Sequence, residues 1–269
     1  MRRLTYTDGR GRVWQLDDPS RALVGTGAAL RGWEIPGTGA RSERGEPEVS
    51  LSVTAGKAYL DGLAEALRTD AMTGRAGTLA YDSVWERRAR AVAIDAGTIT
   101  PARAECSLKL ALLDGCWHRE RTAQFLPSHA DGGTALDMPH DHLHDLGETR
   151  RSGRIDTGIA TECPVRLTIY GQAVNPRITI GGNVYAFDQT VTTGARLEVD
   201  GTGARKTIEL VGSDGGRTDA FACGRRGTGR GGGEYCFEPL QPGEQAVQWD
   251  GSFGFDLRWW ETRGGLPWT

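Results

Sequence analysis

Alternation of hydrophobic and polar residues is the dominant pattern along the first half of the chain. Apolar residues occupy every second position in segments 48–53 and 106–113, and segment 83–93 is a longer candidate of the same kind. Side chains of a β-strand point to opposite faces in turn, so this period predicts strands in these segments. Residues 4–16 carry two short apolar stretches on either side of a turn containing Asp and Gly, and they predict a hairpin.

One segment, 58–72, has the period of a helix instead. Leu60, Leu63 and Leu67 recur at intervals of three and four residues, and charged residues occupy positions between them. That spacing places the leucines on one face of an α-helix. Gly74 follows two positions after this segment and is the type of residue at which a helix ends. The sequence therefore predicts one prominent helix in the first half.

Short alternating stretches become more regular in the second half. Turns containing Gly, Asp or Pro separate them, and Gly is abundant, with 39 residues in the whole chain. The expected strands are 165–170, 177–180, 184–187, 196–200 and 206–211. Short strands that recur at about ten-residue intervals are typical of a β-sandwich or a β-barrel.

A change of character between residues 145 and 162 marks the expected domain boundary. The segment 145–154 is polar, charged and poor in apolar residues. We therefore predict domains at 1–155 and 156–269. The expected fold class is mainly β, with an N-terminal β-barrel or sandwich that includes the helix, followed by a C-terminal β-sandwich.

Composition narrows the function classes. The chain has 269 residues, 38% of them hydrophobic, and a net charge of −3. This charge gives no electrostatic footprint for nucleic acid. No stretch approaches the ~20 apolar residues of a membrane-spanning helix, and the N-terminus carries no apolar run typical of a secretory signal. We expect no membrane insertion.

The cysteines number five, and their spacing fits neither a disulfide framework nor a zinc site of the CxxC type. A reduced, cytosolic place of synthesis, with the thiols acting as small buried apolar groups, is the simpler interpretation.

Four stretches of the second half together carry a family resemblance. They are Tyr170–Ile178, which contains a Tyr-Gly pair and an Asn-Pro pair, the acidic and proline-containing turn Phe237–Glu244, the closing strand Gly251–Trp259, and the short tail Gly264–Trp268. In their order and spacing these stretches resemble the siphophage distal tail protein family, whose members form the hub of the tail tip. The resemblance covers residues 160–269, is a matter of pattern over residues 1–60, and does not extend to residues 114–150.

This resemblance implies a non-enzymatic structural protein of a long-tailed bacteriophage that needs no cofactor. The N-terminal domain would be the belt that closes a homohexameric ring, and the C-terminal domain would be a galectin-like β-sandwich outside the ring. The ring would join the tail tube protein to the baseplate or to a tail fibre or hub protein, and viral DNA would pass its lumen without specific binding. The protein would be located at the tail tip of the virion, after synthesis and assembly in the cytoplasm of the host bacterium.

A histidine-rich stretch is the main candidate for a metal site. His140, His142 and His144 would project from one face of a strand, and three imidazoles on one face can hold Zn²⁺ or Fe²⁺. Pro139 and nearby glycines favour a loop, in which histidines are usually solvated. We therefore assign no metal and keep these three residues as weak candidates.

Two further patterns resemble a nucleotide-binding motif and a catalytic pair, but the surrounding sequence supports neither function. Gly227–Gly232 fits GxGxxG, but residues typical of a strand follow it, whereas a dinucleotide site needs a helix there. We expect a long hairpin loop whose arginines give it local positive charge. The functional alternative is contact with the next ring of the tail or with an acidic neighbouring surface. Cys116 and His118 are close in sequence, but that spacing does not show that they form a catalytic pair. We predict no catalytic residues.

Carbohydrate binding during host adsorption is the alternative function. Trp249, Trp259 and Trp260 could stack on a sugar. Because Trp259 and Trp260 are adjacent, a strand would point them to opposite faces, with one in the core and the other at an interface or ligand. A galectin-like fold does not by itself establish this activity.

Overall fold

The chain folds into two compact units. A computed structural model describes residues 4–17, 22–24, 48–100, 103–113, 115–127 and 151–266. One unit consists of Met1–Arg119 together with Thr262–Thr269, and we call it the first unit. The second unit is Glu120–Glu261.

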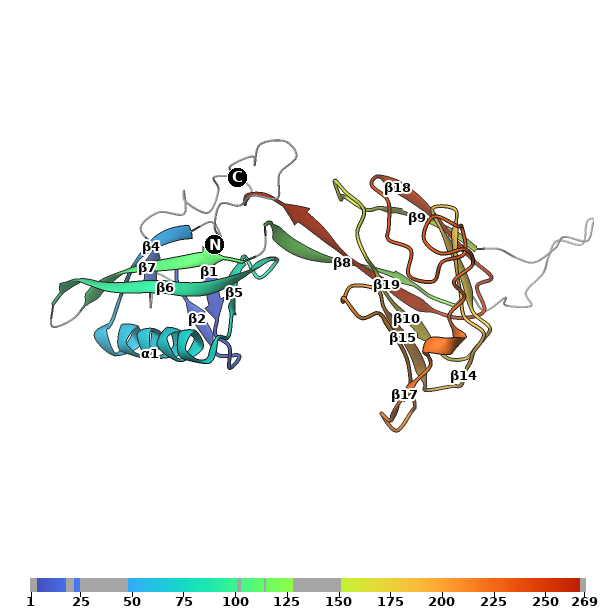
Figure 1. Ribbon diagram of the computed structural model, residues 1–269, viewed down its shortest axis with the longest axis horizontal. Coiled ribbons are helices and arrows are strands. Elements are labelled where there is room, and N and C mark those ends of the chain that lie inside the picture. Colours follow the sequence, from blue (N-terminus) through green and yellow to red (C-terminus); the bar gives the residue numbers. More distant parts are fainter. Residues whose placement is uncertain are drawn as a thin grey trace, which may run out of the picture. The chain divides into compact units, whose positions relative to one another are not determined.

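The first unit contains one helix, α1 (Lys57–Thr73), among its described residues. Its strands are β1 (Leu4–Thr7), β2 (Val13–Gln15), β3 (Ala22–Val24), β4 (Glu48–Ala55), β5 (Gly77–Tyr81), β6 (Trp85–Ile99) and β7 (Ala104–Leu112), and the chain leaves it in β8 (Trp117–Phe125) and returns in β19 (Phe255–Arg263). Strands β1 to β7 form one antiparallel ladder in the order β2-β1-β5-β6-β7-β4-β3. Figure 1 labels each of them except β3.

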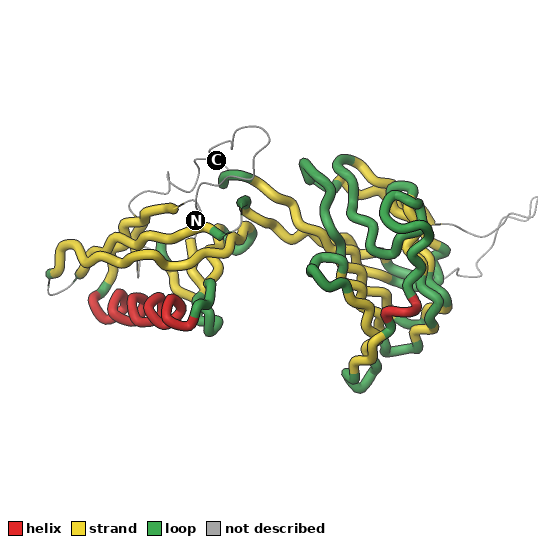
Figure 2. Tube along the Cα trace, viewed as in Figure 1, coloured by secondary structure: helices red, strands yellow, loops and turns green. Residues whose placement is uncertain are grey.

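Helix α1 packs its leucine face onto the core of this ladder. Leu60, Leu63 and Leu67 are buried, whereas Asp61 and Glu65 are exposed. The helix ends at Gly74, which adopts φ +65° and donates its backbone N–H to the helix. A left-handed glycine at this position is a common way to end a helix. The helix predicted over 58–72 is confirmed (Figure 2).

The second unit is a sandwich of two antiparallel sheets. Its remaining elements are β9 (Arg151–Asp156), β10 (Arg166–Tyr170), β11 (Ala173–Val174), β12 (Arg177–Ile180), β13 (Asn183–Ala186), β14 (Thr190–Val191), β15 (Arg196–Asp200), β16 (Thr207–Val211), β17 (Arg217–Asp219), the short 3-10 helix η2 (Phe221–Cys223) and β18 (Glu244–Trp249). One sheet has the order β17-β16-β15-β10-β19-β8 within this unit, and the other has the order β13-β12-β18-β9.

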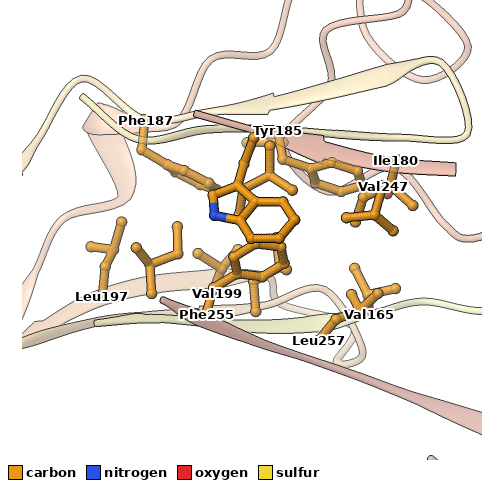
Figure 3. Close-up of a cluster of buried hydrophobic side chains, with 14 of the residues drawn as sticks. Val165, Ile180, Tyr185, Phe187, Leu197, Val199, Val247, Phe255 and Leu257 are labelled. Carbon is orange, nitrogen blue, oxygen red and sulfur yellow. The ribbon is translucent and has the colours of Figure 1, made fainter. Parts of the chain in front are cut away.

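Side chains from both sheets fill the space between them. Tyr185 and Val247 come from one sheet, and Leu197, Phe255 and Leu257 come from the other (Figure 3). Each is at most 1% exposed. At about 25 cal/mol per Å² of apolar surface removed from water, this burial is the main favourable contribution to the folding of the unit. The structure therefore confirms the mainly β fold class and the sandwich.

The units divide at a different place from the boundary predicted at 155/156. Strand β8 enters the second unit at Glu120, and β9 pairs along its whole length with β18 in that unit. The polar stretch that suggested the boundary thus ends in a strand, with Ile155 7% exposed in the core. Charged residues on the exposed face of an edge strand look like a linker in the sequence, although Ile155 on the other face is buried. The roles of belt and galectin-like domain remain predictions.

Candidate functional site

The far half of β6 is largely exposed to solvent. Buried and exposed residues alternate from Trp85 to Arg90, after which the alternation stops. Every residue from Asp95 to Ile99 is exposed. Val92 and Ile99 are 47% and 58% exposed, which is unusual for β-branched aliphatic side chains in a long strand.

This part of β6 also has an open hydrogen-bonding edge. Ala89 pairs with Gly77 of β5 and with Leu112 of β7, so these two strands lie on opposite sides of β6. β7 continues along β6 to Ile99, whereas β5 pairs only as far as Ala89. Among the described residues, no strand pairs with the β5 side of β6 from residue 90 to residue 99. A long edge with exposed apolar side chains is a template for pairing with another chain.

The sequence interpretation missed this overhang. The expected strand ended at residue 93, whereas β6 continues to Ile99. The signal was present in the stretch 91–94, in which four successive apolar residues put apolar groups on both faces of the strand. A strand that covers only one face of a core alternates cleanly, so loss of alternation indicates a second surface to be covered.

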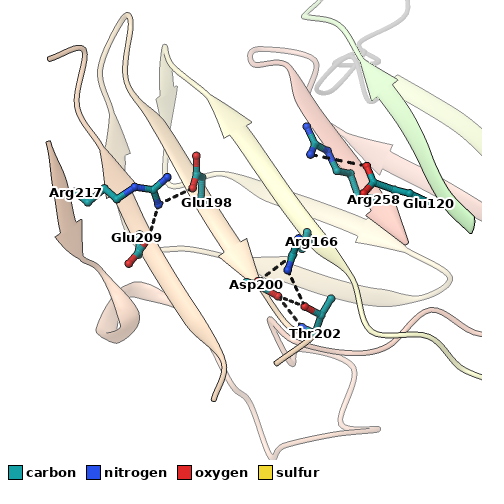
Figure 4. Close-up of polar contacts among 8 residues, drawn as sticks. All are labelled: Glu120, Arg166, Glu198, Asp200, Thr202, Glu209, Arg217 and Arg258. Atoms are coloured by element: carbon teal, nitrogen blue, oxygen red, sulfur yellow. Dashed lines mark hydrogen bonds and ion pairs between the residues drawn. The ribbon is translucent and has the colours of Figure 1, made fainter. Parts of the chain in front are cut away.

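A charged network covers the outer face of the larger sheet in the second unit (Figure 4). Arg217 Nη1 lies 2.9 Å from Glu198 Oε2 and 2.5 Å from Glu209 Oε2. Arg166 Nε pairs with Asp200 at 2.9 Å. Burial alone would raise the pKa of Glu198, but hydrogen bonds from arginines outweigh it and hold this pKa below its usual value. The face is thus highly charged but internally neutralised.

Two of the three tryptophans considered for sugar stacking are in the core. Trp249 is 9% exposed and donates its indole N–H to the carbonyl oxygen of Phe253. Trp259 is 4% exposed, and the adjacent Trp260 is half-buried. The guanidinium of Arg166 lies 5.1 Å from the centre of the Trp260 ring. The burial of Trp259 and the partial exposure of Trp260 agree with the prediction that these neighbours point to opposite faces, and of the three tryptophans only Trp260 is not buried.

The Gly227–Gly232 stretch is a sequence of turns. Gly229 donates its N–H to the carbonyl oxygen of Arg226, and the next regular element that the structure describes is the strand β18. The loop interpretation is therefore confirmed. Its positive charge is largely paired, because Arg225 binds Asp188 through two nitrogens at 2.9–3.1 Å and Arg230 contacts Glu162. The Arg230 hydrogen bond lowers the pKa of the Glu162 carboxyl.

The candidate metal ligands His140, His142 and His144 lie outside the described residues. Within the described ranges, no group of three or more His, Cys, Asp or Glu side chains could hold a metal ion. Cys116 Sγ and His118 Nε2 do come within 3.9 Å of each other. A nucleophile and base pair also requires a third group that orients the base and a place for substrate, so this distance does not by itself make the two residues a catalytic pair.

All five cysteines are free, as the sequence interpretation expected. Cys106, Cys163 and Cys236 are buried. Burial raises the pKa of the Cys236 thiol to about 11, so this thiol stays protonated near neutral pH. In the described part of the chain, α1 is too short and too polar to span a membrane.

Comparison with known proteins gives matches at the level of structure alone. No protein-family model matches the chain, and the search of curated proteins returned no match.

The matching structures come from bacteriophages. A chain of the phage P2 baseplate, solved in its activated conformation with Ca, is similar with a TM-score of 0.53 at 10% identity, covering 99% of this chain and 100% of that one. The Dit protein of phage SPP1, a paradigm of the hub adsorption apparatus in phages that infect Gram-positive bacteria, is similar with a TM-score of 0.54 at 11% identity, covering 98% and 99%. The chain therefore has the fold of these baseplate and hub proteins over nearly its whole length.

Proposed function

We propose that this protein is a structural subunit of the tail tip of a long-tailed bacteriophage, a distal tail hub protein. The observation that carries the proposal is the similarity to the SPP1 Dit hub protein and to the P2 baseplate chain over at least 98% of this chain. A likeness that included one common sandwich alone would say little about function. Here the similarity extends over nearly the whole of both chains, and so includes the residues of both units.

The mechanism would be mechanical rather than catalytic. Copies of the chain would form a closed hexameric ring, whose lumen lets viral DNA pass without specific contacts. Closed rings use two different surfaces of each subunit, and closure is what stops further growth. The ring would connect the tail tube protein to the baseplate or to a fibre or hub protein. The protein would be assembled in the cytoplasm of the host bacterium and would reside in the virion.

The overhanging part of β6, residues 90–99, is the surface that we assign to the ring contact. Its open edge offers backbone donors and acceptors in a row, and a neighbouring copy could add a strand to it. Val92 and Ile99 would lose their exposure to water in that contact. The first unit would therefore act as the belt, and the second unit, the proposed galectin-like domain, would dock peripheral proteins.

Native mass spectrometry of the full chain tests the ring. We expect a closed assembly of about six copies for the unaltered protein. The double variant Val92→Asp and Ile99→Asp should be mainly monomeric, because charges at an apolar interface oppose its burial. The matched control is Val174→Asp in the second unit, where Val174 is 67% exposed, and this variant should keep the ring.

A stable monomer of the unaltered chain at high concentration would contradict the ring. Equal dissociation of the Val174→Asp control would contradict the assignment of the contact to β6.

A further inference from the structure

An open hollow lies in the second unit beside the short helix η2. It has a volume of about 600 Å³ and is lined by Asp219, Phe221, Ala222, Gly224 and Arg226. This volume is in the range of sites that bind small molecules or short peptide segments. The hollow lies outside the β6 overhang assigned to the ring, so the inference does not depend on the proposed function.

The floor and the wall of the hollow are packed closely against the core. A Cβ atom at Gly224 would lie 2.5 Å from Ile208 Cδ1 and 2.8 Å from Cys236 Sγ, so only a glycine lets the backbone approach the core this closely. The Phe221 ring stacks on Phe237 with ring centroids 5.8 Å apart. A surface that is already ordered loses less conformational entropy when a partner binds.

Arg226 is held in place but is not neutralised. Its Nη2 donates a hydrogen bond to the carbonyl oxygen of Phe221 at 3.0 Å, and its guanidinium carbon lies 4.2 Å from the centre of the Phe221 ring. Among the described residues, Arg226 makes no ion pair, whereas its neighbours Arg225 and Arg230 are paired with Asp188 and Glu162. Arg226 is an exposed residue that lines the hollow, and its guanidinium carries further N–H donors besides the one bound to Phe221.

The chemistry of this site selects a carboxylate next to an apolar group. A guanidinium binds a carboxylate through two parallel hydrogen bonds, and the Phe221 ring, 37% exposed, offers an apolar contact beside it. Asp219 Oδ1 accepts the N–H of Phe221 at 2.9 Å, and its second oxygen can accept a backbone N–H of a bound segment. Arg and aromatic residues are the types enriched at the centres of protein interfaces.

We propose that this hollow is a docking site for an acidic segment of another protein, with an Asp or Glu carboxylate on Arg226 and an adjacent apolar side chain on Phe221. The site would add a specific contact to the second unit that is independent of ring closure. The sequence indicated local positive charge in this loop, which carries three arginines. Among the described residues, Arg225 and Arg230 have acidic partners, so Arg226 is the arginine whose charge is available to a ligand.

Fluorescence anisotropy of the full chain with two labelled peptides tests the site. The first peptide is capped at both ends and contains Asp-Leu-Asp between glycines, and the second replaces each Asp with Asn. We expect the Asp peptide to bind about tenfold or more tightly than the Asn peptide. Arg226→Ala should remove this preference, and Phe221→Ala should weaken both peptides. Arg205→Ala is the matched control, because Arg205 is also exposed, and it should leave binding unchanged.

Three results would overturn the proposal. One is that neither peptide binds. Another is that Arg205→Ala weakens binding as much as Arg226→Ala, which would indicate unspecific charge attraction. The third is competition by glucuronate as effective as that by the unlabelled Asp peptide, which would indicate a sugar carboxylate as the ligand. Native mass spectrometry of Arg226→Ala should give the same assembly as the unaltered chain, which separates this test from that of the ring.

Discussion

The indole N–H of Trp259 donates a hydrogen bond to the backbone carbonyl oxygen of Thr157 over 2.8 Å, inside the sandwich of the second unit. Thr157 is completely buried, so water cannot replace this donor. The bond ties β19 to the segment that follows β9, two parts of the chain that are 102 residues apart. A buried carbonyl that loses its partner retains the full cost of its desolvation.

Substitution of Trp259 by Phe should therefore destabilise the protein by about 2–4 kcal/mol, from the unpaired carbonyl and the cavity left by the smaller ring. Trp260→Phe, one position along the same strand, should cost less than about 1 kcal/mol, since Trp260 is half-buried. Urea unfolding followed by circular dichroism measures both. Equal destabilisation by the two substitutions would contradict the assigned faces of β19.

This pair also shows how far sequence reasoning reaches. Strand parity alone predicts that Trp259 and Trp260 point to opposite faces, and helical spacing alone predicts the buried leucines of α1, because both follow from local geometry. The extension of β6 to Ile99 was missed because its outer half has no core to cover and so loses its period. Hydrophobic periodicity reflects which residues are buried within their own chain. A surface that binds another chain is not buried in this way, so it does not follow the same periodicity.

The docking hollow could be predicted only in part. The three arginines near the glycine-rich loop were visible in the sequence as local positive charge. Their partners Asp188 and Glu162 are 37 and 68 positions away from Arg225 and Arg230 in the chain (225 − 188 and 230 − 162), and no local pattern indicates such pairing. Tertiary contacts therefore decide which arginine remains available, and only the structure shows that it is Arg226.

A buried carboxylate in the first unit leads to a second prediction. Asp70 of α1 is 2% exposed and accepts hydrogen bonds from the backbone N–H of Gly9 at 2.9 Å and from the Tyr6 hydroxyl at 3.3 Å. It attaches the helix to the β1-β2 hairpin. Asp70→Ala should cost about 1–3 kcal/mol, because both donors are left without a partner. Thermal unfolding of this variant and of Asp61→Ala, an exposed position on the same helix, measures the difference.

The Asp61→Ala control should change the stability by no more than about 0.5 kcal/mol. If it destabilises the protein as much as Asp70→Ala, general helix effects rather than the two hydrogen bonds would be responsible.

The charged network on the outer sheet should contribute little to stability. Glu198 and Glu209 are directly opposite each other on β15 and β16, and Arg217 lies between their carboxylates. Arg217→Ala would leave two like charges facing each other across the strands, which should lower the stability slightly. Chemical unfolding at low salt and at roughly 1 M salt should show this cost shrinking, because the Debye length falls to about 3 Å.

Adding Glu209→Gln to Arg217→Ala removes the repulsion and should recover most of the loss. A cost that is unchanged at high salt and in the double variant would show that packing of the Arg217 side chain, rather than charge, is responsible.

Alkaline pH should destabilise the second unit through Tyr185. Burial raises the pKa of this phenol, the negative charge of Glu238 raises it further, and the hydroxyl donates a 2.6 Å hydrogen bond to the Glu238 carbonyl oxygen. The unfolded chain loses the phenol proton near pH 10, whereas the folded protein retains it. Above that pH the native state binds more protons than the unfolded state, so the free energy of unfolding falls as the pH rises.

The contribution of Tyr185 is therefore complete below about pH 10 and is lost progressively above it. Tyr185→Phe should lower stability at neutral pH by about 1 kcal/mol, for the lost hydrogen bond, but should make the decline above pH 10 less steep. Urea unfolding at a series of pH values from neutral to alkaline measures the slope. Tyr6, whose pKa is also raised by burial and by the charge of Asp70, adds a similar decline, so the slope should decrease again in the double variant with Tyr6→Phe. An alkaline slope that is the same in all three proteins would show that neither phenol is protected from ionisation by the fold.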